Sequence, residues 1–255
     1  MGALLSWVNR LDRGTVSAAS ATSMDASALL TPQINDVWRS QTWNASTVTI
    51  SATLAGSFPI NVVAVAAPRD GALPTGACTI RITAGSTAGS STALDTGSLS
   101  FSLSPWGVWG WRSVAGVTAQ YWTLEVTSVS SNPYLDLGRL WIGPALITSR
   151  GYAFGASRGG RDPGTVSRSA LTGTRYARLG RPYRVERMAL PALTSAEATQ
   201  VEAMAAAVGA TGQVFAARSD ASLSDGIFGA FVEPPAVVRA YPQVWTADMQ
   251  IEEDA

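Results

Sequence analysis

The pattern of residues 183–255 constrains the fold of this chain more than any other stretch. Tyr183–Leu190 has the composition of a strand and is followed by Pro191, where a strand is expected to stop. Thr194 then occupies a helix N-cap position with Glu197 three residues later, which is the spacing of a capping box. Apolar residues recur behind it at helical spacing and predict a short helix that ends at Gly209. This apolar stripe consists of Val201, Met204, Ala205 and Val208.

Three further strands are predicted after that helix, at Gln213–Arg218, Ile227–Val232 and Val244–Glu252. In the last of them apolar residues alternate with polar ones, so one face is expected to be apolar and the other polar and acidic. The polar face carries Asp248, Gln250 and Glu252. A single helix packed on a small, mostly antiparallel sheet is a building block and not a substrate pocket.

Residues 36–147 have the pattern of a β-sandwich. Thr47–Leu54 alternates apolar and polar residues, whereas Asn61–Ala67 is a nearly continuous apolar run that suits a strand covered on both faces. Several more short alternating runs follow, with turn residues between them. Cys78, the only cysteine, lies in the strand-like run Cys78–Thr83 and is expected to be a small core residue without a disulfide.

The N-terminal stretch is less regular. Leu4–Leu11 is predicted to form either a short helical turn or a strand against another element. Ser17–Ser27 is rich in Ser, Ala and Thr and has little to bury, so we expect an extended arm or linker there.

Residues 150–187 form an arginine-rich segment in a chain whose formal net charge is zero. All basic residues of the chain are arginines, and in this segment only Asp162 and Glu186 oppose them. We expect a long structureless arm, which is either a nucleic-acid arm or, preferably, an arm laid on an adjacent subunit. The arginines expected to contact that subunit are Arg158, Arg161, Arg168, Arg175 and Arg178. A basic arm and an acidic C-terminal portion favour head-to-tail contacts, which can close into rings.

The chemistry of an enzyme is not indicated. The chain contains no histidine, so the G-x-S-x-G match at Gly155–Gly159 lacks the base that a serine hydrolase needs. Without histidine and with one cysteine, no metal centre is predicted, and no motif for a cofactor or a phosphate is present. We therefore predict no catalytic residue, no cofactor and no metal, although a carboxylate site is not excluded. No apolar run is long enough to span a membrane.

Trp106, Trp109 and Trp111 form a cluster of aromatic residues within the predicted sandwich. One interpretation is a platform for sugar rings, since aromatic faces suit the apolar faces of carbohydrates. The other is that these rings close one end of the sandwich or pack against a neighbouring unit. The alternate spacing of Trp109 and Trp111 puts both on one strand face, which favours packing.

Several of these stretches resemble a known family. Tyr183–Pro191, the helix Thr194–Val208, Gly212–Phe215 and Val244–Glu252 resemble the tail-tube-like domain of minor tail proteins in long-tailed bacteriophages. Arg139–Ala145, with the tyrosine- and glycine-rich stretch and the Ser-Arg-Gly-Gly sequence at 157–160 behind it, is similar to the junction at which a galactose-binding-like β-sandwich rejoins the ring domain of such proteins.

The resemblance implies a mainly β chain in which a jelly-roll or galactose-binding-like sandwich is inserted in a tail-tube-like domain. Residues 1–35 would join the ring domain, 36–147 form the sandwich, 148–182 the arm and 183–255 the ring domain. It implies a distal tail protein: a structural virion component, assembled in the bacterial cytoplasm, whose ring is often a hexamer. The ring would link the tail tube protein to tail-tip hub or baseplate proteins.

In that family DNA passes through the ring without specific binding. An acidic lining would repel phosphate, so Asp248, Gln250 and Glu252 are the predicted lumen-facing residues. The alternative prediction is a carbohydrate-binding module of a surface or secreted protein, with a surface glycan bound through Trp106, Trp109 and Trp111.

Overall fold

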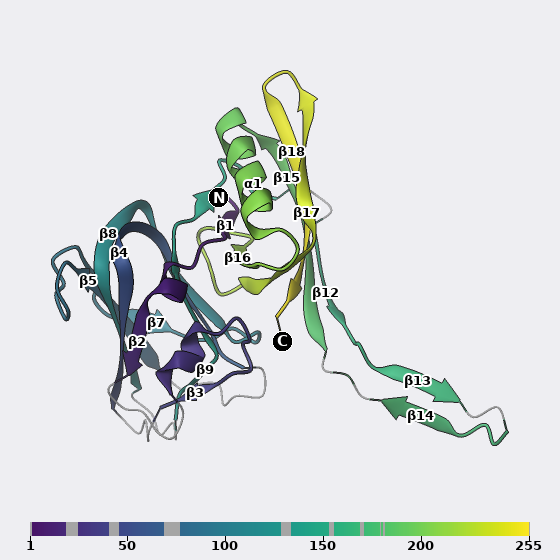
Figure 1. Ribbon diagram of the computed structural model, residues 1–255, viewed down its shortest axis with the longest axis horizontal. Helices are drawn as coiled ribbons and strands as arrows, with labels where there is room; N and C mark the ends of the chain where they lie inside the picture. The colour runs from purple at the N-terminus through teal and green to yellow at the C-terminus, as the bar shows by residue number, and fades with distance from the viewer. Residues whose placement is uncertain are drawn as a thin grey trace.

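The computed structural model describes residues 2–18, 25–40, 46–68, 77–128, 134–152, 156–168, 171–178, 180 and 182–254. The chain is mainly β with one α-helix, as predicted, and consists of two packed units from which a long arm projects (Figure 1). We call them the helix–sheet unit and the sandwich unit. The sandwich unit is inserted between the first strand of the helix–sheet unit and the rest of it.

The helix–sheet unit is built on one seven-stranded antiparallel sheet. From edge to edge its strands are β11 (Leu146–Ile147), β1 (Leu4–Ser6), β16 (Gln213–Ala217), β17 (Ile227–Tyr241), β18 (Val244–Glu253), β15 (Tyr183–Leu193) and β12 (Ser157–Arg161). Two predicted strand ends are wrong. β15 continues through Pro191 because a bulge near Ala192, whose φ is 51°, lets the strand resume pairing at Leu193. β17 runs on to Tyr241 because β18 pairs with it along the whole hairpin.

Helix α1 (Ser195–Val208) covers one face of this sheet. Its capping box is the predicted one: the Thr194 hydroxyl accepts a hydrogen bond from the Glu197 N–H, and the Glu197 carboxylate accepts one from the Thr194 N–H. Gly209 ends the helix with a φ of 58°. Val201, Met204 and Val208 are buried against sheet residues that include Met188, Leu190, Met249 and Ile251.

The sandwich unit is dominated by two long strands, β4 (Thr47–Ala66) and β8 (Val108–Ser128). Register shifts at Thr53–Phe58 and at Ile60–Val62 let both strands bend, so that one hydrogen-bonded sheet folds over its own core (Figure 1). The remaining strands of this sheet are β2 (Thr15–Ala18), β5 (Cys78–Gly85), β6 (Leu94–Asp95), β7 (Leu99–Phe101) and β10 (Arg139–Gly143), and β3 (Trp38–Arg39) pairs separately with β9 (Asp136–Leu137). Cys78 is buried in this core, as predicted.

The sandwich unit begins earlier in the chain than residue 36. β1 joins the helix–sheet unit, but β2 already pairs with β4 of the sandwich. The 3₁₀ helices Arg10–Arg13 and Ala26–Leu30 insert Leu11 and Leu29 into the sandwich core. The expectation of an extended linker at Ser17–Ser27 is therefore wrong at both ends of that stretch, and residues 19–24 lie outside the described part of the chain. The leucines that flank the Ser/Ala/Thr run supply the burial that the run itself lacks.

A third apolar cluster joins the two units. The second half of β4 is covered on both faces, as its continuous apolar sequence predicts. Val63 and Val65 point into the sandwich core, whereas Val62, Ala64 and Ala66 pack in a cluster with residues of the helix–sheet unit. Those partners include Leu4, Phe215, Ala217 and Phe228. The interface is therefore apolar, which favours a fixed orientation of the two units.

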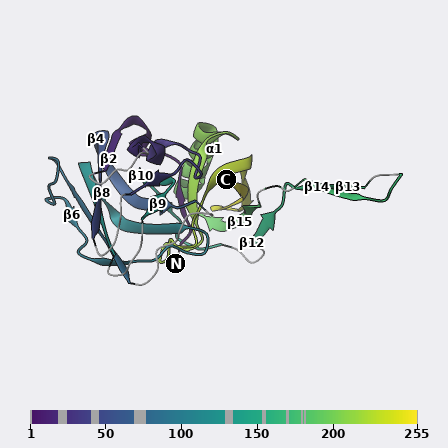
Figure 2. The same ribbon diagram turned by 90° about the horizontal axis from the view of Figure 1, so that it is seen from below.

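The arginine-rich segment is ordered as strands, so the expectation of a structureless arm is wrong. β12 is the edge strand of the seven-stranded sheet and pairs with β15. Beyond it, β13 (Thr165–Arg168) and β14 (Arg175–Arg178) form a two-stranded hairpin that runs away from the body in both views (Figures 1 and 2). Backbone pairing with β15 and between β13 and β14 fixes this geometry, and such pairing requires no apolar alternation in the sequence.

Candidate interaction sites

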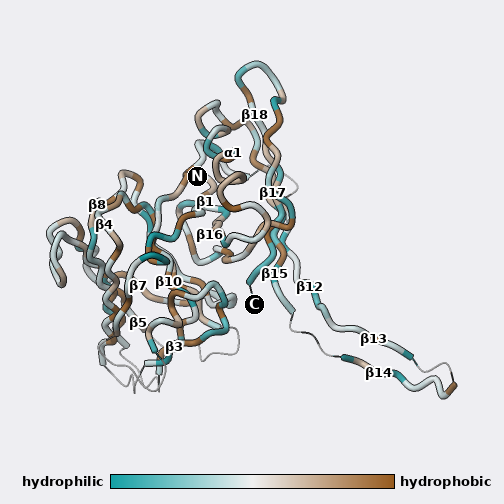
Figure 3. Tube along the Cα trace, viewed as in Figure 1, coloured by the Kyte–Doolittle hydropathy of each residue, from teal (hydrophilic) through white to brown (hydrophobic). Residues whose placement is uncertain are grey.

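The arm formed by β13 and β14 is exposed along its whole length. Every residue of the two strands is exposed. Arg168, Arg175 and Arg178 form no ion pair with any residue that the structure describes. The arm carries apolar side chains as well, since Leu171 is 97% exposed. The tube coloured by hydropathy shows apolar positions in the arm (Figure 3). An exposed hairpin that carries cations and exposed apolar side chains is a candidate interaction surface.

Exposed large apolar side chains concentrate on two hairpins. Across the described ranges seven such residues are exposed, and six of them lie on β13–β14 or on β17–β18. The arm holds Val166, Leu171 and Tyr176, and the β17–β18 hairpin holds Val232, Val238 and Tyr241. Isolated apolar residues are ordinary on a protein surface, but their confinement to two projecting elements marks both as contact surfaces.

The base of the arm is tied to its own chain. Arg158 lies 3.4 Å from both Glu186 and Asp225, and Arg161 lies 3.1 Å from Glu252. These two arginines have acidic partners in their own chain because β12 is an edge strand that brings them beside acids of neighbouring segments, and their contact with an adjacent subunit stays a prediction. Arg168, Arg175 and Arg178, farther out, remain candidates for contact with another subunit.

A buried ionic cluster lies where the arm meets the body. Glu186 is 1% exposed, and its carboxylate forms ion pairs with Arg158 of β12 and with Arg218, which directly follows β16. Arg184, fully buried, donates from Nε to Glu253 at 3.1 Å and from Nη2 to the Gly226 carbonyl at 2.7 Å. Burial lowers the pKa of Arg184, and the nearby Glu253 carboxylate opposes that shift. The sequence analysis missed this cluster, although Arg184 and Glu186 stand in phase with the buried Met188.

The three predicted lumen-facing residues lie on a sheet face that is open in the single chain. Asp248 is exposed and Gln250 and Glu252 are half-buried, while the alternating Ala247, Met249 and Ile251 are buried. The alternation is thus confirmed; the role in a lumen stays a prediction. The face also carries cations, because Arg187 pairs with Gln250 and Arg161 contacts Glu252. It is therefore mixed in charge.

A groove of about 360 Å³ crosses this open face. Val232, Pro234, Ala236 and Met249 form its apolar lining. Glu233 and Asp248, both exposed, provide two carboxylates, and Arg187 is the one cation among its lining residues.

The three tryptophans of the suggested sugar platform are placed as packing residues. Trp106 lies beneath the Arg184 guanidinium, 5.1 Å from ring centre to Cζ. Trp109 is 8% exposed, contacts Phe101, and donates its indole N–H to the Ser100 carbonyl at 3.2 Å. Trp111 points to the same side as Trp109, into the sandwich core. A role in glycan binding stays a prediction.

A second groove borders these rings, between the sandwich unit and the loop that joins β16 to β17. Its volume is about 420 Å³, and its polar lining includes Arg112 and Asp220, which are paired at 3.0 Å, together with Ser100, Ser102, Ser222 and Ser224. Trp109 and Trp111 line one side of it.

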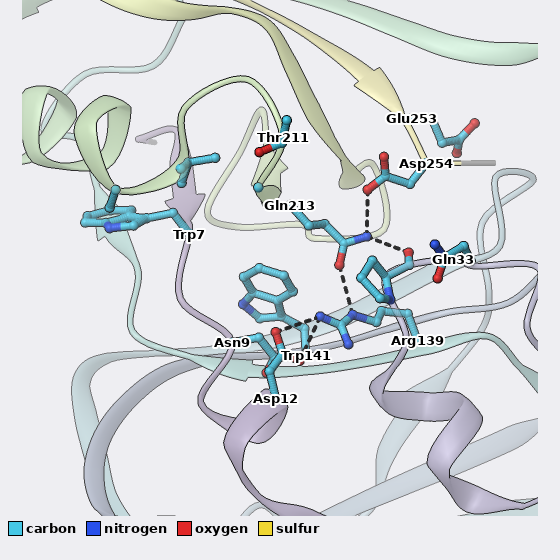
Figure 4. A pocket seen from close by; sticks show the side chains of 14 residues that line it. Trp7, Asn9, Asp12, Gln33, Arg139, Trp141, Thr211, Gln213, Glu253 and Asp254 are labelled. Carbon is cyan, nitrogen blue, oxygen red and sulfur yellow. Dashed lines mark hydrogen bonds and ion pairs between the residues drawn. The ribbon is translucent and has the colours of Figure 1, made fainter.

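A pocket of about 690 Å³ lies between the two units (Figure 4). Arg139 is 1% exposed there, bonds to Asp12 at 2.8 Å, and donates from Nε to Gln213 at 2.9 Å; Gln213 in turn donates to Asp254. Burial raises the pKa of Asp12 and of Asp254, against the opposing effects of Arg139 and, for Asp254, of the hydrogen bond from Gln213. This network connects the two units, and its polar groups form hydrogen bonds and an ion pair with one another.

Ser157, of the G-x-S-x-G match, lies in the edge strand β12 and not at a strand-to-helix turn. Within the described ranges no three His, Cys, Asp or Glu side chains form a group that could hold a metal ion. No helix found among these residues combines the length and the apolar character that crossing a membrane requires.

No protein-family model matches the chain, and no curated protein matches it. Solved structures of galactose-binding-like β-sandwich modules are similar to the sandwich part. The family 32 carbohydrate-binding module of C. perfringens NanJ, in complex with galactose, is 15% identical with a TM-score of 0.44, covering 54% of this chain and 98% of that one. Chitosan-binding module 1 of a Paenibacillus chitosanase/glucanase is 20% identical with a TM-score of 0.42, covering 53% and 98%.

Proposed function

We propose that this chain is a non-enzymatic structural subunit that assembles with copies of itself into a ring, and that this ring is part of a phage tail. The observation that carries the proposal is the arm. The hairpin leaves the body, exposes apolar side chains and carries three arginines that form no ion pair with any described residue, so a partner is the explanation that we favour. If the arm of each chain contacts a different surface of the next chain, the contact is heterologous, and its repetition around an axis closes a ring.

The tail assignment rests on the sequence resemblance of residues 183–191, 194–208 and 244–252 to tail-tube-like domains. By that resemblance the ring is hexameric and stands between the tail tube and the tip, with DNA passing through its centre.

The test is removal of the arm. Because Arg161 and Tyr183 are paired across β12 and β15, residues 163–181 can be replaced by a two-residue Asn-Gly turn without disturbing the sheet. We expect the full chain to form closed rings at high concentration in light scattering and negative-stain images, and the armless chain to remain monomeric with an unchanged melting temperature. Equal assembly by both chains would refute a role of the arm, and a monomeric full chain would refute ring formation.

Carbohydrate binding by the sandwich unit is a second candidate function. The observation that favours it is the groove that combines Trp109 and Trp111 with four serine hydroxyls, a carboxylate and a guanidinium. Aromatic rings with hydroxyl and charged groups are suited to sugar rings. We expect titration calorimetry with galactose and chitosan oligomers to show binding that Trp111→Ala abolishes and Trp106→Ala, outside the groove, retains. Absence of binding to a broad glycan array would exclude this function.

A further inference from the structure

The arm carries an electrostatic conflict that only a partner can relieve. Arg168 and Arg175 lie directly opposite each other in the β13–β14 ladder, so their side chains share one face of the hairpin with Val166 and Ala177. Like charges placed directly opposite on a strand pair destabilise it. No described acid forms an ion pair with either arginine. The arm is therefore expected to gain stability when two anionic groups meet that face.

The groove on the open sheet face presents the complementary arrangement. Glu233 and Asp248 are exposed carboxylates on neighbouring strands, and they outnumber the single cation Arg187 in the lining. Between them Val232, Pro234 and Ala236 leave apolar surface uncovered. An apolar floor bordered by acids fits a partner with an apolar tip bordered by cations.

We infer that the arm of one chain docks in this groove of the next copy, with Leu171 on the apolar floor and with Arg168 and Arg175 beside Glu233 and Asp248. The arm leads away from the sheet that bears its own groove, as both views show, so the groove it reaches belongs to another copy (Figures 1 and 2). The inference rests on the proposed self-assembly and names the surface that receives the arm. It assigns Asp248 and Gln250 to a contact between copies, whereas the sequence analysis expects them in a channel lining.

Charge exchange tests the pairing. Arg168→Glu with Arg175→Glu, or Glu233→Arg with Asp248→Arg, places like charges together, and each pair of changes should weaken association on the order of 100-fold. All four changes in one chain should restore association to within about 10-fold of the wild type, because the charges are complementary again. Since all four side chains are exposed, the melting temperature should be unchanged in every variant. Raising the salt concentration should weaken wild-type association, because the pairs are screened.

Cross-linking tests the contact itself. The only native cysteine, Cys78, is buried, so new cysteines report on their own positions. Leu171→Cys combined with Val232→Cys should give, on oxidation, a ladder of disulfide-linked chains. The matched control, Leu171→Cys with Ala203→Cys on the exposed side of α1, should give no ladder under the same oxidation, because residue 203 lies away from the groove.

The outcomes separate this inference from the proposed function. If the wild type forms rings but neither charge exchange weakens them and the Val232 ladder is absent, the arm docks elsewhere: the inference is overturned and the ring stands. If the wild type does not associate at any concentration, the ring and the docking site both fall. Weakening by each exchange, recovery in the fourfold variant and a ladder specific to Val232 support the inference.

Discussion

At the scale of a residue, the buried carboxylate of Glu197 and the half-buried carboxylate of Asp254 illustrate opposite outcomes of burial. Glu197 and Asp254 are both withdrawn from water, which penalises the charged form of each. Glu197 accepts hydrogen bonds from the N–H groups of Thr194 and Ser149, and these outweigh burial and lower its pKa. The Asp254 carboxylate accepts a hydrogen bond from Gln213. The effect of burial is larger than the effect of this bond, so the pKa of Asp254 is raised.

We predict that Glu197→Gln destabilises the fold by about 1–2 kcal/mol at pH 7, since it weakens charge-assisted bonds at the N-terminus of α1. A carboxylate with a lowered folded pKa contributes stability that is present above its unfolded pKa and is lost as the pH falls through the folded pKa. The difference between wild type and variant, measured by urea unfolding, should therefore shrink from pH 7 to pH 3. A constant difference would contradict this assignment.

Asp254→Asn should behave in the opposite way. A group whose pKa is raised in the folded state contributes stability below its unfolded pKa, and this contribution is lost as the pH rises through the folded pKa. At neutral pH the charged, half-buried carboxylate of Asp254 therefore destabilises the wild type. Asparagine still accepts the hydrogen bond from Gln213. We expect the variant to melt at an equal or higher temperature at pH 7, by roughly 2 °C, and to lose that advantage at pH 4. Asp36→Asn, at an exposed acid, serves as the control.

At the scale of the element, the sequence predicts what local chemistry determines. Helix α1 was predicted from its cap, its apolar stripe and Gly209, all of which act within a few residues. The arm was not predicted as strands, because β12 is ordered by its pairing with β15, and no property of Ser157–Arg161 alone reveals that partner. The arginines were recognised as an arm, but Arg158 and Arg161 were assigned to another subunit because pairing across the sheet depends on its register.

The arm base gives the prediction at this scale. Glu186→Gln leaves Arg158 and Arg218 without the buried carboxylate that both contact. The loss should be about 2–3 kcal/mol, at the low end for a broken buried pair because the two arginines retain 20% and 30% exposure. Urea unfolding measures the loss, and Glu202→Gln, on the exposed side of α1, is the control. A loss equal to that of the control would mean that the cluster is incidental to stability.

At the scale of the whole molecule, the arrangement of the two units follows from a single strand that both of them cover. The continuous apolar run of β4 predicts that both faces of this strand are buried. The sequence does not show what packs on the second face, because Leu4, Phe215 and Phe228 are brought together by the sheet of the other unit. Phe215 packs against Phe228 in a tilted arrangement with ring centres 4.7 Å apart, and Phe215 is fully buried. The coupling between the units thus depends on a few large side chains.

We predict that Phe215→Ala costs about 3–5 kcal/mol, by leaving a cavity in the interface cluster, and that it separates the unfolding of the two units. In the wild type the shared cluster should make the units melt in one calorimetric transition, since neither can lose its side of the cluster alone. In the variant two transitions are expected, with the sandwich unit, whose own core is the larger cluster, melting last. Phe58→Ala, at a residue packed against the sandwich core away from the interface, is the matched control: it should lower the sandwich transition without splitting the profile. A single, merely lowered transition in Phe215→Ala would show that the units remain coupled by their polar contacts, which include the Asp12–Arg139–Gln213–Asp254 network and the Arg112–Asp220 ion pair.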